Sequence, residues 1–225
     1  DQLGLQHPAL DAKPTGQTLL VWGGSTSVGS NAIQLAVAAG YEVITTASPK
    51  NFEYVKQLGA SQVFDYNSPT VVKDIIKAFQ GNTSAGAIAI GSTSVEACLD
   101  IMNACEGNKF VSIATFPVSF DTLAPSSNVR LQMLKQAPRL LSFGLSMVFK
   151  SRLRRIRTSF IIGTTLMNNE VSKVIYEDFL PQALAIGSYV AAPEPHVVGK
   201  GLDCVQVGLD LQVKGVSAKK IVVSL

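Results

Sequence analysis

The sequence has few of the residues on which metal and redox sites depend. It contains two histidines and three cysteines, and Cys98, Cys105 and Cys204 form no CxxC pair. Because histidine and cysteine are the usual zinc ligands, we expect no zinc site within this chain. The three thiols are expected to be reduced and mostly buried, as in a cytoplasmic protein.

Long apolar runs and a strong charge imbalance are also absent. No stretch approaches the roughly 18 uninterrupted apolar residues of a membrane-spanning helix, so we expect no membrane span. The net charge is +3 and 16% of the residues are charged, which is too even a balance to indicate nucleic-acid binding. The densest charge cluster, residues 150–157, is interpreted as a solvated helix end or edge. What remains is a globular protein of 225 residues whose expected partner is a small-molecule substrate.

The chain starts at Asp1, which is neither a methionine nor the beginning of a secretory signal. We therefore expect it to be processed or cut from a longer protein. Residues 1–16 end in a Pro-Thr-Gly turn, and they are expected to be the remnant of a preceding element.

Beyond residue 16, short apolar strands alternate with helices that end at glycines such as Gly40 and Gly59. Strands are expected at 18–22, 41–46, 62–64, 87–90, 109–114, 160–162 and 220–225. The alternation is interrupted over residues 115–155, which contain three prolines. Short connections between alternating strands and helices predict an α/β fold with a parallel sheet covered on both faces. We expect one domain over 17–190 and a C-terminal return segment over 191–225.

The most informative stretch is a turn of small residues between the first strand and the first helix, from Gly23 to Gly29. Unpaired N–H groups and the helix dipole make such a helix start an anion site, so phosphate or pyrophosphate is the expected occupant. A plain tight strand–helix connection is the alternative. The predicted contact residues are Gly24, Ser25, Thr26, Ser27, Val28 and Gly29.

Two details of this turn narrow the classes of ligand that it is expected to bind. Ser30 follows the last glycine, where a P-loop carries its lysine, and this disfavours a nucleoside triphosphatase. Thr26 stands where a dinucleotide fingerprint has its middle glycine, and its hydroxyl is expected to donate to the phosphates. A branched side chain in place of Gly29 is expected to block the approach of a pyrophosphate.

The end of the second strand lacks the carboxylate that holds the ribose 2′-hydroxyl in NAD sites. It reads Thr-Thr-Ala-Ser-Pro-Lys over residues 45–50. The Ser48 hydroxyl, free N–H groups and the Lys50 ammonium would meet where a 2′-phosphate lies, which favours NADPH over NADH. The alternative is that Ser48 only caps a helix and Lys50 is a surface lysine. The missing acid also disfavours a methyltransferase that uses S-adenosylmethionine.

Three further strand ends contribute candidate cofactor contacts. Tyr66 follows the third strand, where the adenosine half of a dinucleotide lies, although a plain turn tyrosine is an equal alternative. The residues after the fourth and fifth strands are expected at the nicotinamide and its ribose. These residues are Gly91, Ser92, Thr93, Ala114 and Thr115.

Three segments, taken in order, resemble a known family. They are Gly-Gly-Ser-Thr-Ser-Val-Gly over 23–29, Leu-Gly-Ala over 58–60 with Phe-Asp-Tyr over 64–66, and the closing segment 215–223. Together they resemble the medium-chain dehydrogenase/reductase superfamily, which shares its fold with zinc-type alcohol dehydrogenases. Within it, the zinc-independent quinone oxidoreductases and trans-acting enoyl reductases are the most similar branch. The resemblance covers nearly the whole chain.

This resemblance implies a Rossmann fold with a doubly wound parallel sheet of six strands, which binds NADPH and supports hydride transfer to an activated C=C or carbonyl. It also implies that residues 191–225 return to a GroES-like catalytic domain that this chain largely lacks, so no catalytic residue is assigned. A truncated, non-catalytic NADPH-binding or regulatory module is the alternative. Because the sixth strand pairs across a two-fold axis in the family, a homodimer through Phe160–Thr164 is predicted.

Overall fold

A computed structural model describes residues 2–115, 129–167 and 169–225. Its centre is a sheet in which six strands follow the order β3-β2-β1-β4-β6-β7, with the short β5 beside β4. All of its strand pairs are parallel. The strands are β1 Gln17–Trp22, β2 Glu42–Ala47, β3 Gln62–Asp65, β4 Thr83–Ala89, β5 Glu106–Gly107, β6 Phe110–Ile113 and β7 Arg157–Phe160. This is the doubly wound Rossmann arrangement that the sequence predicts, with β5 as an additional strand.

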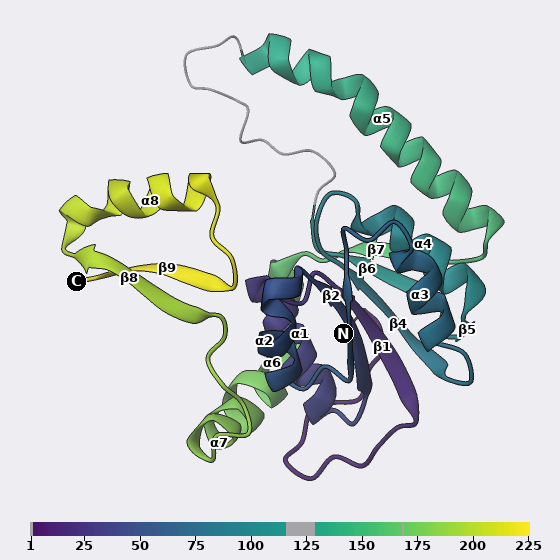
Figure 1. Ribbon diagram of the computed structural model, residues 1–225, viewed down its shortest axis with the longest axis horizontal. Coiled ribbons are helices and arrows are strands. Elements are labelled where there is room, and N and C mark those ends of the chain that lie inside the picture. Colours follow the sequence, from purple (N-terminus) through teal and green to yellow (C-terminus); the bar gives the residue numbers. More distant parts are fainter. Residues whose placement is uncertain (1, 116–128, 168) are drawn as a thin grey trace.

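Helices cover both faces of the sheet because the side chains of a buried strand alternate between its two faces. Leu19 and Val21 of β1 pack toward α1 and α2, whereas Leu20 and Trp22 pack toward α3 and α4. Figure 1 shows these two helix pairs on opposite sides of the sheet. The helices are α1 Ser27–Ala38, α2 Phe52–Gln57 after the 3-10 turn η1 Pro49–Asn51, α3 Val71–Ala78 and α4 Ser94–Ala104.

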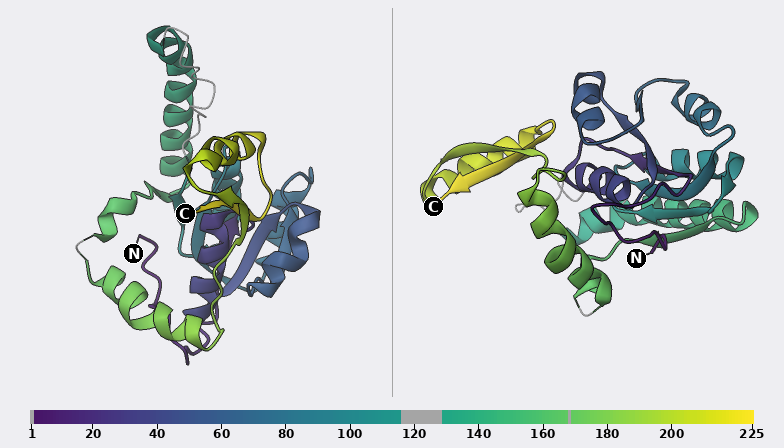
Figure 2. Two further views of the ribbon diagram at one scale, coloured as in Figure 1. Left: turned by 90° about the vertical axis from the view of Figure 1, so that its left-hand side faces the viewer. Right: turned by 90° about the horizontal axis from the view of Figure 1, so that it is seen from below.

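The interruption expected over 115–155 contains a long helix that the sequence pattern does not predict. Helix α5, Val129–Leu153, includes Pro138, and its Phe143 and Met147 pack against the core beside α4. Its opposite side exposes apolar side chains such as Leu145 and Phe149. Figures 1 and 2 show α5 projecting away from the sheet. The prolines of this segment therefore did not exclude a long helix, since Pro138 lies inside α5.

Two strands differ from their expected bounds by more than one residue. Strand β4 starts at Thr83 rather than residue 87, because the small residues that precede Ala87 are buried by neighbouring strands although they are not strongly apolar. Strand β7 is Arg157–Phe160, and the apolar Ile161 and Ile162 lie past its end, exposed. The dimer edge predicted over 160–164 therefore includes only one residue of the strand, and residues from Gly163 belong to the 3-10 turn η2 Gly163–Leu166.

Strand β7 is the last strand of the sheet, and its hydrogen bonds to β6 fix its orientation. The N–H groups of Arg157 and Ile161 donate to the carbonyls of Lys109 and Ile113, each over 2.9 Å. Because successive N–H groups of a strand point in opposite directions within the sheet, that of Thr158 faces away from β6.

The chain then returns along α1 as one continuous helical stretch and ends in a separate small sheet. The stretch comprises α6 Glu170–Lys173, the π-helical segment η3 Val174–Phe179 and α7 Leu180–Ala185. The C-terminal unit comprises β8 Glu194–Lys200, η4 Leu202–Cys204, α8 Val205–Lys214 and β9 Lys219–Ser224. Strands β8 and β9 pair in parallel with each other. Figure 2 shows this unit beside the main sheet rather than within it.

Hydrogen bonds fasten the linker before the C-terminal unit to helix α1. The Asn31 amide donates to the carbonyl of Ala192 over 3.2 Å and accepts from the Tyr189 hydroxyl. The Gln34 amide donates to the carbonyl of Val190 over 3.1 Å and accepts from its N–H over 2.8 Å. The linker thus places the C-terminal unit next to the start of α1.

Candidate functional site

The glycine turn at the start of α1 is anchored to strand β2. The N–H of Gly23 donates to the Thr46 hydroxyl over 3.0 Å, and that of Gly24 donates to the Thr46 carbonyl over 2.9 Å. Thr26 is the N-cap of α1: its hydroxyl accepts from the N–H of Gly29 over 3.0 Å and donates to the carbonyl of Gly23 over 2.9 Å. In this structure the single proton of the Thr26 hydroxyl is therefore used within the turn, whereas the sequence predicts that it is donated to phosphates.

Three N–H groups of the turn face no acceptor among the residues that the structure describes. Those of Ser25, Ser27 and Val28 donate to no group among the residues that the structure describes, whereas those of Gly24, Thr26 and Gly29 bond within the turn or to β2. Unpaired N–H groups at a helix start, aligned with the helix dipole, bind anions. The turn therefore offers three backbone donors to a phosphate group.

Two glycines of the turn are required by packing inside the protein. A Cβ on Gly29 would lie 2.2 Å from the carbonyl oxygen of Gly23 and 2.7 Å from the Cα of Gly24. A Cβ on Gly24 would lie 2.2 Å from the hydroxyl oxygen of Thr45. A side chain at Gly29 would thus collide with the turn itself. The expected block of a pyrophosphate stays a prediction.

A cavity of about 520 Å³ opens beside the turn, past the carboxyl ends of β1 and β2. It brings together predicted residues from three places in the chain: Ser25, Thr26 and Ser27, then Ser48 and Lys50, then Tyr66. The hydroxyl oxygens of Ser48 and Tyr66 are 3.0 Å apart. The Ser48 side chain caps no helix, so the plain capping role considered for it does not hold. The Ser48 hydroxyl, the Tyr66 phenol and the Lys50 ammonium therefore line the same cavity.

The far side of this cavity comes from the C-terminal unit, which the sequence analysis did not place there. Ser217 and Lys219 line it, and the Asn51 amide donates to the Ser217 hydroxyl over 3.0 Å. Lys219 also forms an ion pair with Glu194, whose pKa is lowered by that hydrogen bond and by the charge of the lysine. The only sequence signal was that Lys219 lies in the closing segment used for the family resemblance, since no local spacing relates it to Lys50.

The remaining predicted contacts lie at other strand ends. The N–H of Gly91 donates to the Thr115 hydroxyl over 2.9 Å, and that of Ala114 donates to the carbonyl of Ala89 over 2.9 Å, which joins the carboxyl ends of β4 and β6. Ser92 and Thr93 are exposed and line a different cavity of about 450 Å³, between α4 and α5. The structure therefore does not bring these five residues into the cavity of Lys50. They lie past neighbouring strands of the same parallel sheet.

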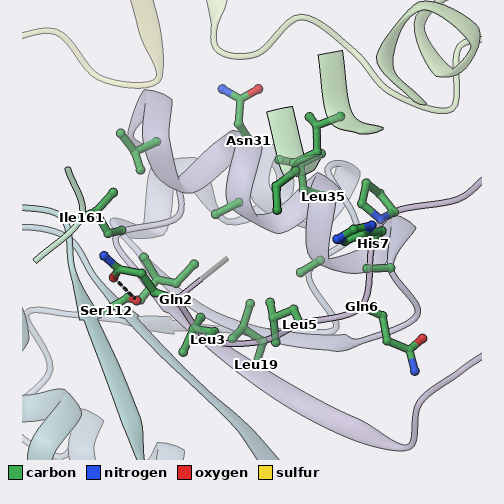
Figure 3. Close-up of a pocket in the computed structure, with 18 of the residues that line it drawn as sticks. Gln2, Leu3, Leu5, Gln6, His7, Leu19, Asn31, Leu35, Ser112 and Ile161 are labelled. Atoms are coloured by element: carbon green, nitrogen blue, oxygen red, sulfur yellow. Dashed lines mark hydrogen bonds between the residues drawn. The ribbon is translucent and has the colours of Figure 1, made fainter. Parts of the chain in front are cut away.

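A third cavity, of about 390 Å³, is largely apolar and lies between the N-terminal segment, α1 and residues 161–175 (Figure 3). Leu3 and Leu5 lie along its floor beside Leu19. At one end the Ser112 hydroxyl donates to the Gln2 side-chain oxygen over 3.1 Å. Residues 2–8 thus pack on the Rossmann sheet and form one wall of this cavity.

Within residues 2–115, 129–167 and 169–225, no three histidine, cysteine or acidic residues gather closely enough to hold a metal ion. No helix in those segments has the length and apolar character needed to cross a bilayer.

A sequence model of the family described as zinc-binding dehydrogenase matches residues 27–175. The chain belongs to this family. The match runs from the last residues of the glycine turn into the helical stretch after β7, and it confirms the family resemblance.

Curated relatives match over the whole chain. Dehydrogenase pigH from Monascus ruber is 53% identical over 226 residues, covering 100% of this chain and 60% of the relative. The trans-enoyl reductase himH from Aspergillus japonicus is 36% identical over 227 residues, covering 100% of this chain and 57% of the relative. The chain thus spans about 60% of the length of these relatives.

Solved structures share the fold at low sequence identity. CurA from Vibrio vulnificus, in complex with NADPH, superposes with a TM-score of 0.64 at 18% identity, over 96% of this chain and 58% of that one. The CurK enoyl reductase superposes with a TM-score of 0.65 at 18% identity, over 99% of this chain and 58% of that one. These likenesses support the Rossmann assignment.

Proposed function

We propose that the chain is the cofactor-binding part of an NADPH-dependent oxidoreductase that reduces an activated C=C bond or carbonyl. The observation that carries the proposal is the cavity of about 520 Å³, which is lined by Ser25 and Ser27 of the glycine turn, by further hydroxyl groups and by two lysines, and whose lining contains no carboxylate. The names of the relatives, dehydrogenase and trans-enoyl reductase, support the reaction class.

The donors of the glycine turn and of this cavity fit the two charged parts of NADPH. The N–H groups of Ser25, Ser27 and Val28 suit the pyrophosphate, since backbone donors at a helix start hold phosphate oxygens in dinucleotide sites. The hydroxyl of Ser48 and the ammonium of Lys50 suit the 2′-phosphate, because charge-assisted hydrogen bonds to phosphate are the stronger kind.

The C-terminal unit adds a second cation to the proposed 2′-phosphate site. Lys219, whose ammonium is paired with Glu194, lines the same cavity as Lys50, and Tyr66 lies next to Ser48. An acidic side chain at the end of β2 would repel the 2′-phosphate, whereas Lys50 and Lys219 stabilise it. We therefore infer a preference for NADPH over NADH.

The strand ends carrying Gly91, Ser92, Thr93, Ala114 and Thr115 are the proposed place of the nicotinamide and its ribose. NADPH, when bound, supplies the hydride. The chain's own part is to bind and orient, which is most of what a direct hydride transfer asks of a protein. We assign no catalytic residue within these 225 residues.

Titration of nicotinamide fluorescence tests the proposal. We expect wild-type protein to bind NADPH more tightly than NADH. Lys50→Ala and Lys219→Ala should each weaken NADPH binding about tenfold, as expected for a lost hydrogen bond to a charged group, and should leave NADH binding unchanged. Lys56→Ala is the matched control, since Lys56 lies on α2 outside the cavity and pairs with Glu53. Equal affinity of the wild type for the two cofactors would refute the assignment of the 2′-phosphate.

A further inference from the structure

A buried serine contacts the glycine turn from inside the protein. Ser30, in the first turn of α1, is fully buried, and its hydroxyl donates to the carbonyl of Gly24 over 3.1 Å. The same hydroxyl oxygen lies 2.8 Å from the phenol oxygen of Tyr54, which belongs to α2. The proposed pyrophosphate contacts do not include either side chain.

The order of donors in this chain of hydrogen bonds follows from the number of protons. A serine hydroxyl has one proton, and Ser30 gives it to Gly24, so the Tyr54 phenol donates to the Ser30 oxygen. Burial raises the pKa of Tyr54, which keeps this donor protonated at neutral pH. The sequence of donors is therefore Tyr54 to Ser30 to the Gly24 carbonyl.

The carbonyl of Gly24 and the N–H of Ser25 belong to one peptide group. A trans peptide is planar, so its C=O and N–H bonds point in nearly opposite directions. The hydroxyl of Ser30 holds the carbonyl toward the protein interior, and the N–H of Ser25 is consequently directed the other way. Ser25 lines the cavity of about 520 Å³, and its N–H is one of the three that face no acceptor among the described residues.

No other donor in the described chain holds this carbonyl. Without Ser30, the Gly24–Ser25 peptide could rotate toward water, because glycine has access to a wide range of backbone angles. The hydrogen bond between Tyr54 and Ser30 also links the glycine turn to the segment that carries Lys50. Lys50 lies in η1, and Tyr54 lies four residues later in α2.

We propose that Ser30 and Tyr54 are positioning residues that aim the Ser25 N–H at the pyrophosphate of the cofactor. This inference rests on the proposed function, because it takes the anion at the turn to be the NADPH pyrophosphate. It assigns a role to the residue that stands where a P-loop has its lysine: at this position a hydroxyl acts through the backbone rather than on the phosphate itself.

Two ligands separate this role from a general structural one. NADPH contains both the pyrophosphate and the 2′-phosphate, whereas adenosine 2′-monophosphate lacks the pyrophosphate. We expect Ser30→Ala to weaken NADPH binding about 10- to 100-fold, the range for a lost hydrogen bond to a charged group, and to leave the binding of adenosine 2′-monophosphate unchanged. Tyr54→Phe, which removes one oxygen, should weaken NADPH binding less, about threefold to tenfold.

Tyr66→Phe is the matched control, because its hydroxyl lies beside Ser48 at the proposed 2′-phosphate site and should affect both ligands alike. Isothermal titration of the full 225-residue chain measures all affinities. If Ser30→Ala fails to fold, Tyr54→Phe decides the question alone.

Unchanged NADPH affinity in Ser30→Ala and Tyr54→Phe would overturn this inference while leaving the proposed function in place. An equal loss of affinity for NADPH and adenosine 2′-monophosphate in these two variants would do the same. A wild-type protein that binds neither ligand would overturn the cofactor assignment and this inference with it.

Discussion

Replacing Gly29 by alanine adds one methyl group at the most crowded point of the glycine turn. The new Cβ would lie 2.2 Å from the carbonyl oxygen of Gly23, 2.7 Å from the Cα of Gly24 and 2.9 Å from the carbonyl carbon of Gly23. All three atoms are backbone, so no side chain can rotate out of the way. The start of α1 has to move relative to β1, and the N–H groups of Ser27 and Val28 move with it.

The size of the effect follows from two opposing contributions. Overpacking costs about 1–3 kcal/mol, and we expect the upper end because backbone has to shift. Alanine returns about 1 kcal/mol through its helix propensity. The net loss of about 2 kcal/mol corresponds to a melting temperature lower by about 4–8 °C for a chain of this size. NADPH affinity should fall by at least tenfold, since more than one phosphate donor is displaced.

Gly144→Ala is the matched control. Gly144 lies in α5, a Cβ there meets no heavy atom within 4 Å, and its backbone angles suit any residue. This variant should be stabilised by about 0.5–1 kcal/mol and bind NADPH as the wild type does. Thermal unfolding followed by circular dichroism, with a parallel NADPH titration, measures both quantities. A Gly29→Ala protein with wild-type melting temperature and affinity would refute the packing argument.

Two further predictions concern the thiols and the sheet edge. Burial raises the pKa of Cys105 to about 11 and raises the pKa of Cys98 further. Cys204 should therefore react first with a thiol reagent, and the two buried cysteines should react only on unfolding. The time course of labelling with and without denaturant measures this order, and equal rates for all three cysteines would contradict it. If the protein forms a dimer through β7, Thr158→Pro should yield monomers in light scattering. The pairing of β7 with β6 should remain, because the N–H of Thr158 faces away from β6. A wild-type protein that is monomeric would refute the predicted dimer.

Local sequence signals predicted the elements that depend on neighbouring residues. The parallel order of strands and helices follows from apolar runs with short connections, and the helix ends follow from glycines such as Gly40 and Gly59, which adopt the positive φ that a helix terminus needs. The same local signals indicated an anion site at the turn and placed Ser48, Lys50 and Tyr66 past the ends of adjacent strands. The strand ends of a parallel sheet meet at one edge, so this convergence could be expected from the order of elements alone.

Contacts between residues far apart in the chain were decided by the tertiary structure. Lys219 and Ser217 reach the site only because the linker after α7 is bonded to α1, and no spacing in the sequence encodes that arrangement. The direction of individual hydroxyls also lay beyond the sequence: Thr26 turns inward to cap α1, and Ser30 turns toward Gly24. The residue types of the turn specified that an anion could bind there. Packing of α1 against β2 and α2 decided which N–H groups are left to bind it, because each polar group inside a protein takes the nearest partner that the fold provides.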